Sequence, residues 1–253
     1  MAVSKAAGAI PDAQEELVAL RAELEHQRNE NAIKERQLDR YAADLRATSR
    51  RERQRARELS ESYMATVRAL AGAVEARDAY TAHHGDRVTA YGIELAAASG
   101  LEIADESELE CAFLLHDIGK VAIPDGILFK AGTLDSHERE VMQRHPVIGE
   151  EIISEIAFLE PARPLVRNHH ERWDGGGYPD GLAGLEIPLV ARVFALADAL
   201  DALTSDRPYR AAVAIAQARE EIECSDGQFD PAVLEAFATI PDERIEEIRR
   251  SLD

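Results

Sequence analysis

The residues best suited to chemistry are an adjacent histidine and aspartate, His116 and Asp117, within the run Cys111-Ala-Phe-Leu-Leu-His-Asp-Ile-Gly-Lys120. The apolar neighbours predict burial, and burying an imidazole beside a carboxylate costs free energy unless a partner compensates them. A divalent metal ion is such a partner, because imidazole and carboxylate are both good ligands for first-row metals. The alternative is a hydrogen-bonded histidine next to an aspartate at a helix end, and this dipeptide alone does not decide between the two.

Residues of the same two types recur elsewhere in the chain. The whole set is His84, His116, Asp117, His145, His169, His170 and Asp198. Each alone fits a polar group satisfied within a core, but seven metal-type groups in one helical domain favour a shared site. Because neighbouring residues on a helix point about 100° apart, the adjacent pair can hold different ions or two sides of one cluster. Imidazole and carboxylate without thiolate suit iron, manganese or similar ions in a multi-metal hydrolytic site.

The elements that position these residues are all predicted to be helices, because no convincing β alternation is found. Gly100 is a natural residue just after a helix end, and Asp135 with Glu138 has the shape of a capping box at a helix start. The predicted helices cover residues 83–99, 106–119, 135–146, 160–170, 187–203, 211–224, 231–239 and 241–252, with a glycine-rich loop over 171–184. The predicted fold class is therefore all-α, a compact helical domain preceded by a long coiled-coil-like helix.

A long helix is predicted ahead of this domain, because residues 12–71 contain no Gly or Pro and are rich in Ala, Glu, Leu, Arg and Gln. A seven-residue repeat runs along it, formed by Leu17, Leu24, Asn31, Leu38, Leu45, Glu52 and Leu59. An asparagine in such a seam fixes register and favours a dimer at a cost in stability. We therefore expect a homodimer, the alternative being a solvated single helix. The expected domains are a dimerising and signalling helix over 1–61 and a globular domain over 62–253.

The bulk composition limits the classes of function. The chain has 253 residues, 45% of them hydrophobic, which is enough for one domain with a core plus an appendage. Its net charge of −19 argues against a general binder of nucleic acid polymers, which normally carries a basic face. No apolar run approaches the roughly 20 residues needed to span a membrane, and no signal-peptide core is found at the start. We expect a cytoplasmic protein.

Four motifs follow one another from residue 116 to residue 210. They are His116-Asp-Ile-Gly-Lys120, His145-Pro-Val-Ile-Gly149, His169-His-Glu-Arg-Trp-Asp-Gly-Gly-Gly-Tyr-Pro-Asp-Gly181 and Asp198-Ala-Leu-Asp-Ala-Leu-Thr-Ser-Asp-Arg-Pro-Tyr-Arg210. In this order they resemble the HD-GYP family of the HD phosphohydrolase superfamily, over roughly residues 70–240. The resemblance implies an all-helical HD-type domain with a two- or three-metal centre. It also implies hydrolysis of the bacterial second messenger cyclic di-GMP to the linear dinucleotide, to GMP or to both.

The resemblance further implies roles for individual residues. The seven histidines and aspartates named above would be the metal ligands, with Asp117 as the bridging carboxylate and a catalytic residue. Lys120 would be a second catalytic residue that holds a phosphate oxygen, while Asp201, Arg207 and Arg210 would contact the substrate. Some family members carry a glutamate one turn before the first histidine, which gives a third metal, but Tyr80 stands there in this chain. Two divalent ions, iron or manganese, are therefore expected.

The sequence leaves competing functions to be tested. A metal-dependent cyclic di-GMP phosphodiesterase is favoured by the complete ligand set. A non-enzymatic module that binds the dinucleotide or a partner protein would be indicated by missing ligands, and Tyr80 is the one departure found. An HD hydrolase of another nucleotide is disfavoured by the sequence Gly177-Tyr178-Pro179. The glycine-rich loop itself is either a simple turn, a close-approach loop at the mouth of the site, or a surface for partner proteins.

Overall fold

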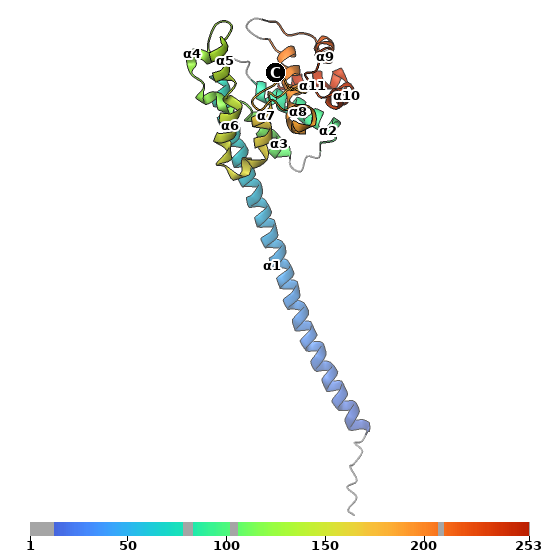
Figure 1. Ribbon diagram of the computed structural model, residues 1–253. Coiled ribbons are helices and arrows are strands. Elements are labelled where there is room, and N and C mark those ends of the chain that lie inside the picture. The colour runs from blue at the N-terminus through green and yellow to red at the C-terminus, as the bar shows by residue number, and fades with distance from the viewer. Residues whose placement is uncertain (1–12, 78–82, 102–105, 207–209, 253) are drawn as a thin grey trace, which may run out of the picture. The chain divides into compact units, whose positions relative to one another are not determined.

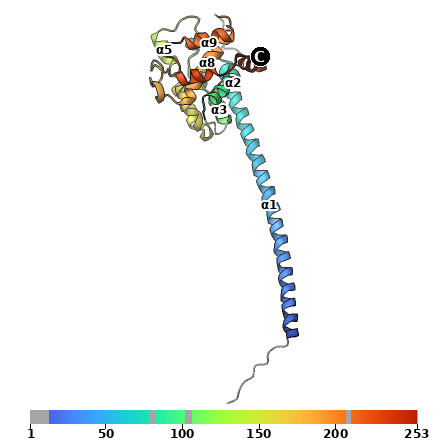
Figure 2. The same ribbon diagram turned by 90° about the vertical axis from the view of Figure 1, so that its right-hand side faces the viewer.

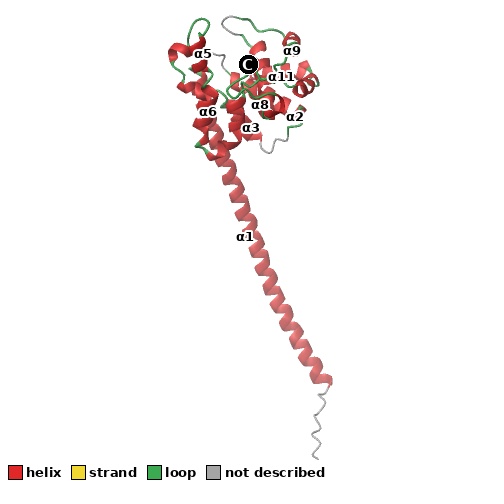
Figure 3. Cartoon of the chain, viewed as in Figure 1, coloured by secondary structure: helices red, strands yellow, loops and turns green. Residues whose placement is uncertain are grey.

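The computed structural model describes residues 13–77, 83–101, 106–206 and 210–252. Within these ranges the regular structure is helical and includes no β-strand, which confirms the predicted all-α class (Figure 3). The chain divides into two compact units between Glu61 and Ser62. No helix of the described part is both long enough and apolar enough to cross a membrane.

Helix α1 covers Ala13–Glu75. Strong helix formers fill it, and Gly72 falls within its last turn without ending it. In the first unit the leucines of the seven-residue repeat stay exposed, from 49% for Leu24 to 72% for Leu45. In the second unit the same helix turns Val67, Ala71 and Val74 into the core. The helix therefore changes from an exposed rod to a packed element along its length.

The second unit is a bundle of short helices around α8, Leu189–Thr204 (Figures 1 and 2). Helix α8 packs against α2 (His84–Ala98), α7 (Arg163–Asn168) and α9 (Ile215–Glu223), and its Val193, Phe194 and Leu196 are fully buried. The ring of Phe194 lies 5.2 Å from that of Phe113 in an edge-to-face contact. The elements after α1 are α2 His84–Ala98, α3 Glu106–Leu114, η1 Ile118–Ala122, α4 Asp125–Leu128, α5 Ser136–Met142, α6 His145–Ser154, η2 Ala157–Ala162, α7 Arg163–Asn168, η3 Gly184–Glu186, α8 Leu189–Thr204, α9 Ile215–Glu223, α10 Pro231–Ala238 and α11 Asp242–Leu252.

The central helix predicted over 106–119 is shorter in the structure and ends at Leu114. Tight turns replace it, in which the amide of Ile118 donates to the carbonyl of Leu115 at 3.0 Å before the 3₁₀ helix η1 begins. Packing of η1 against α6 accompanies this change. A Cβ on Gly119 would lie 1.9 Å from the carbonyl oxygen of His145, so only glycine permits this approach. The break leaves Asp117 on a turn that faces α6.

The sequence predicts a helix that ends at Pro146, so it does not predict helix α6, which begins at His145. The structure places this proline in the first turn of α6, directly after His145. Proline is tolerated there, since the first amides of a helix have no intrahelical acceptor and its fixed φ suits a helix. The capping box predicted at the start of the preceding helix is confirmed, with Asp135 and Glu138 exchanging hydrogen bonds of 2.8 and 2.9 Å.

Candidate metal centre

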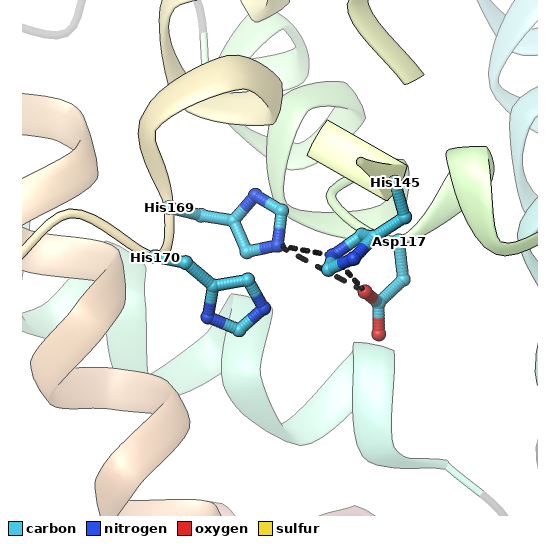
Figure 4. A group of neighbouring side chains, drawn as sticks. All are labelled: Asp117, His145, His169 and His170. Carbon is cyan, nitrogen blue, oxygen red and sulfur yellow. Dashed lines mark hydrogen bonds and ion pairs between the residues drawn. The ribbon is translucent and has the colours of Figure 1, made fainter. Parts of the chain in front are cut away.

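Four of the predicted ligands form one tight group. Asp117, His145, His169 and His170 each offer a ligand atom within 4.8 Å of the others (Figure 4). Asp117 comes from the turn before η1, His145 is the first residue of α6, and the adjacent histidines follow α7. Residues more than 50 positions apart in the sequence are thus brought to one point by the packing of η1, α6 and α7.

The two oxygens of Asp117 face different partners. Oδ1 lies 3.2 Å from Nε2 of His145 and 3.9 Å from Nε2 of His169. Oδ2 lies 3.0 Å from Nε2 of His116 and 2.8 Å from Nζ of Lys120. One carboxylate therefore lies between two sets of polar groups, which is the placement expected of a bridging ligand.

Three imidazoles are held in the tautomer that a metal ligand needs. Nδ1 of His116, His145 and His169 lies 2.7, 2.8 and 2.9 Å from a backbone carbonyl three residues earlier. A carbonyl only accepts hydrogen bonds, so Nδ1 must carry the hydrogen in the neutral ring. Each Nε2 is then left with a lone pair, as in metal-ligating histidines whose other nitrogen is bonded to a second group.

In this tautomer, neither Nε2 of His145 nor Nε2 of His169 carries a hydrogen that it could donate to the other. Nε2 of His145 lies 3.2 Å from Nε2 of His169, so two acceptors face one another beside a carboxylate. Oδ1 of Asp117 is buried, and no hydrogen-bond donor among the described residues satisfies it. Such an arrangement is electrostatically unfavourable unless a cation lies among the acceptors. The donor set of imidazole and carboxylate therefore fits a divalent metal ion.

Burial and mutual repulsion keep the paired histidines neutral. Burial, followed by repulsion from His170 and His145, holds the pKa of His169 well below its ordinary value. Burial, and to a smaller extent repulsion from His145 and His116, lowers the pKa of His170 to about 3. Burial would raise the pKa of Asp117, but the charges of His116 and Lys120 outweigh it and hold that pKa well below its ordinary value. His169 and His170 are therefore neutral beside an ionised carboxylate, as metal binding requires. Burial would lower the pKa of His116, but the charge of Asp117 outweighs it and raises that pKa.

The remaining three predicted ligands, His84, His116 and Asp198, lie beside this group. Nε2 of His84 is 3.6 Å from Oδ1 of Asp198, and the rings of His84 and His116 meet edge to face at 5.7 Å. His84 and Asp198 line a cavity of about 180 Å³ together with His116, Asp117, Lys120 and His170. All seven predicted ligands are thus gathered in one region, because His145 and His169 lie in one group with Asp117 and His170 of this cavity.

Asp201 has a different role from the one predicted. Its carboxylate is only 1% exposed and lines neither cavity of the site, so it is not placed to contact substrate. Instead Oδ2 accepts from Nδ1 of His84 at 2.7 Å, and Oδ1 accepts from Nε of Arg87 at 2.6 Å. Asp201 therefore orients His84, leaving Nε2 of that ring directed at Asp198. The sequence spacing places Asp201 one turn from Asp198 but does not reveal this burial.

A wider groove of about 620 Å³ begins at the histidine pair. Its walls include His170, Tyr178, Asp198 and Arg210, and the Arg210 guanidinium also contacts the carbonyl of Ala202. The predicted substrate residue Arg207 and the departure at Tyr80 lie outside the described residues. Of the predicted substrate contacts, Lys120 lines the smaller cavity and Arg210 the groove.

Glu171, which the sequence analysis did not single out, organises the glycine-rich loop. Its carboxylate is 4% exposed and accepts the amides of Asp180, Gly181 and Leu182 at 2.7, 3.1 and 3.1 Å. The loop turns back so tightly that a Cβ on Gly177 would lie 2.4 Å from the amide nitrogen of Arg172. The glycine there is thus required for close approach, beyond making a turn.

The glycine-rich loop also supplies one wall of the site. The ring of Tyr178 stacks on that of His170, with centroids 4.7 Å apart and planes inclined by 31°. Burial, reinforced by the charge of Asp117, raises the pKa of the Tyr178 phenol, so its hydroxyl keeps its proton at neutral pH. A carboxylate directly after two histidines, followed by three glycines, was the available sequence signal for this arrangement.

Comparison with known proteins identifies the family. A family model described as HD domain matches residues 14–233. The chain is 41% identical over 198 residues to a 3'3'-cGAMP-specific phosphodiesterase 2 of Vibrio cholerae, covering 77% of this chain and 38% of that protein. It is 40% identical over 183 residues to the cyclic di-GMP phosphodiesterase response regulator RpfG of Xanthomonas campestris, covering 71% and 48%. The chain thus spans half the length or less of these relatives.

A solved structure shares the fold. Bd1817, an HDG"Y"P protein from Bdellovibrio bacteriovorus, superposes with a TM-score of 0.50 at 21% identity, covering 66% of this chain and 52% of that one. With the sequence matches and the Gly177-Tyr178-Pro179 loop in place, the chain belongs to the HD domain family and to its HD-GYP group.

Proposed function

We propose that this protein is a metal-dependent phosphodiesterase that hydrolyses cyclic di-GMP. The observation that carries the proposal is the set of imidazole Nε2 atoms turned toward both oxygens of the partly buried Asp117 carboxylate, next to the ammonium of Lys120. Relatives named cyclic di-GMP phosphodiesterases, about 40% identical, support the same substrate class.

The proposed metal ligands are the seven residues predicted from the sequence, holding two ions bridged by Asp117. Iron and manganese are the proposed metals, because imidazole and carboxylate without thiolate suit them. When bound, such ions supply charge neutralisation and activate water for attack on a phosphodiester. Asp201 orients the ring of His84, and backbone carbonyls orient those of His116, His145 and His169, so that each Nε2 would be available to an ion.

The protein's own residues account for substrate orientation. Lys120, 2.8 Å from Oδ2 of Asp117, is placed to hold a non-bridging phosphate oxygen beside the bridge. Arg210 in the groove, and Arg207 near it in sequence, are proposed to hold the second phosphate of the ring. Tyr178 covers His170 and limits access of solvent to that side. Cleavage once gives the linear dinucleotide, and a second cleavage gives GMP.

A second substrate has specific support. The relative 41% identical to this chain is named for 3'3'-cGAMP, which shares the ring of two phosphodiesters and differs in one base. The residues described above are proposed to hold phosphates and metal rather than bases, so they would serve either ring. Competition between the two dinucleotides at equal concentration would rank them.

The test is metal analysis of the purified protein together with product analysis. We expect about two iron or manganese ions per chain and conversion of cyclic di-GMP to linear dinucleotide or GMP. A chain that stays below one ion and gives no product after either metal is restored would instead be a signalling module. Turnover of an unrelated nucleotide without turnover of either cyclic dinucleotide would indicate a different HD hydrolase.

The partners are proposed on separate grounds. A homodimer through α1 is supported by leucines that repeat every seventh residue and remain exposed in the single chain. Residues 1–61 would form the dimerising and signalling segment, and residues 62–253 the phosphohydrolase domain. The Gly177-Tyr178-Pro179 loop remains a proposed surface for partner proteins, and the cytoplasmic location expected from the sequence stays a prediction.

A further inference from the structure

The last turn of α1 forms part of the wall of the cavity of about 180 Å³ beside the proposed metal ligands. Ala71, Val74 and Glu75 line the same cavity as His84 and His116. Within the second unit this turn is fixed to its neighbours by buried Val67 and Val74, and by Arg68, whose guanidinium contacts Asp86 at 2.8 Å and also Glu110. A charged residue at the helix end, Glu75, is therefore held beside the proposed ligands without being among the residues that the sequence singled out.

Glu75 supplies a cap that α2 lacks. Helix α2 begins at His84, and the preceding His83 has a left-handed conformation, with φ 67°, and makes no side-chain capping bond. The first amides of a helix need acceptors from outside it. Oε1 of Glu75 accepts from the amide of Gly85 at 2.8 Å, so one helix caps the next. A Cβ on Gly85 would itself lie 2.8 Å from Oε1, and glycine thus permits the contact.

The capped residue adjoins a proposed metal ligand. His84 directly precedes Gly85, and its ring reaches Asp201 through Nδ1 and Asp198 through Nε2. The ring is thus fixed at one end by Asp201, while the backbone that carries it is fixed by the bond from Gly85 to Glu75. A carboxylate at the start of α2 also interacts favourably with the positive end of the helix dipole.

We propose that Glu75 is a positioning residue that caps α2 from the end of α1 and so holds His84 in place for metal binding. The second half of this statement rests on the proposed metal site, whereas the capping itself does not. The capping requires an acceptor oxygen at the end of a three-carbon side chain, as in glutamate and glutamine, rather than a negative charge. Glutamine at position 75 should therefore preserve the cap of α2, whereas alanine and the shorter aspartate should remove it.

The first experiment measures hydrogen exchange of the metal-free protein over the peptide that contains Gly85. In Glu75→Ala and Glu75→Asp we expect exchange in the first turn of α2 to be about fivefold faster, which corresponds to about 1 kcal/mol. Glu75→Gln should exchange at close to the wild-type rate. The matched control is Glu61→Ala, an exposed glutamate of the same helix. Wild-type exchange in both the alanine and aspartate variants would overturn the proposal.

The second experiment titrates the same four variants with Mn²⁺ alone, followed by calorimetry and by the Mn²⁺ paramagnetic resonance signal. One of the bound ions should bind about tenfold more weakly in the alanine and aspartate variants, and with near wild-type affinity in Glu75→Gln. If glutamine binds Mn²⁺ as poorly as alanine while α2 exchanges normally, Glu75 is a direct ligand and the positioning role is wrong. Failure of the wild type to bind Mn²⁺ would instead count against the metal site, leaving the exchange result to decide the cap.

Discussion

At the scale of single residues, Asp117 has the most demanding position in the molecule. Its carboxylate accepts no hydrogen bond at Oδ1 from the described residues, yet it lies against imidazoles whose hydrogens point away. A residue kept for packing alone would be satisfied by a donor. The cost of leaving this oxygen and the Nε2 atoms opposed is the physical reason to assign them to a cation.

Replacement of Asp117 by asparagine tests this assignment while conserving shape. The amide keeps the volume but removes the charge and places an NH₂ group in the bridge, so metal affinity and cyclic di-GMP turnover should both fall by about 100-fold or more. Metal stoichiometry by elemental analysis and turnover by chromatography are the measurements. The exposed Asp226→Asn variant serves as the control. Retention of both ions by Asp117→Asn would remove Asp117 from the bridge.

The set of metal ligands could be predicted from residue types, because histidines and aspartates on apolar segments are unusual in a protein core. The role of Asp201 was not predictable in the same way. Its partners, His84 and Arg87, lie more than 110 positions away in sequence, and only the packing of α2 on α8 brings them together. A carboxylate that serves another residue has the same sequence signature as one that contacts a ligand.

At the scale of elements, two glycine contacts bring the site together. η1 lies on α6 through Gly119 and Gly149: a Cβ on Gly119 would lie 2.6 Å from the amide nitrogen of Gly149, and a Cβ on Gly149 would lie 3.3 Å from the amide nitrogen of Gly119. The sequence revealed the helices because their apolar spacing and caps are local signals. It did not reveal the break after Leu114 or the start of α6, because both depend on which surface each segment meets in the fold.

The variant Gly119→Ala should separate η1 from α6. Its Cβ would meet the backbone of His145 at 1.9 Å, which side-chain rotation cannot relieve, so we expect about 1–3 kcal/mol of destabilisation and weaker metal binding. The matched control is Gly126→Ala in α4, where nothing lies within 4 Å of the added carbon. Thermal unfolding and Mn²⁺ titration of both variants provide the comparison. Equal melting temperatures for the two would show that the close approach is not needed.

Helices α6 and α7, which present His145 and His169, are also joined by charge. Glu150 of α6 accepts from Arg163 at 2.9 Å and from Arg167 at 2.6 Å. Burial would raise the pKa of Glu150, but the two guanidinium groups outweigh it and lower that pKa. A carboxyl group with a lowered pKa stabilises the fold above its unfolded pKa of about 4.3, and this contribution is lost as the pH falls through the folded value.

The variant Glu150→Gln should therefore be less stable than the wild type by about 1 kcal/mol at pH 7, as expected for a partly screened pair. The difference should be constant from pH 7 to about pH 5 and shrink below about pH 4, where the wild-type carboxyl begins to protonate. Urea unfolding at each pH measures it, and the exposed neighbour variant Glu151→Gln is the control. A difference that grows on acidification would contradict the assigned direction of the pKa shift.

At the scale of the whole molecule, charge and exposed surface set the constraints. A net charge of −19 opposes the approach of an anionic dinucleotide, so attraction must come from the local cations of the site. The first unit presents a different problem, because five leucines of the repeat remain about half exposed or more on a single helix. Pairing with a second copy would cover them in the register of a parallel coiled coil.

The dimer prediction is tested best by placing charges in the seven-residue leucine repeat of the 253-residue chain. Leu38→Glu combined with Leu45→Glu places each carboxylate opposite its copy in the partner helix. The dissociation constant of the dimer should therefore rise by about 100-fold or more. Ala43→Glu, exposed and on the opposite face of the heptad, adds a charge to the same helix and should leave the dimer intact. Light scattering over a concentration series measures the mass, and circular dichroism checks the helix. An unchanged mass in the double variant would place the dimer interface elsewhere, whereas a monomeric wild type would mean that these leucines remain exposed in the single chain.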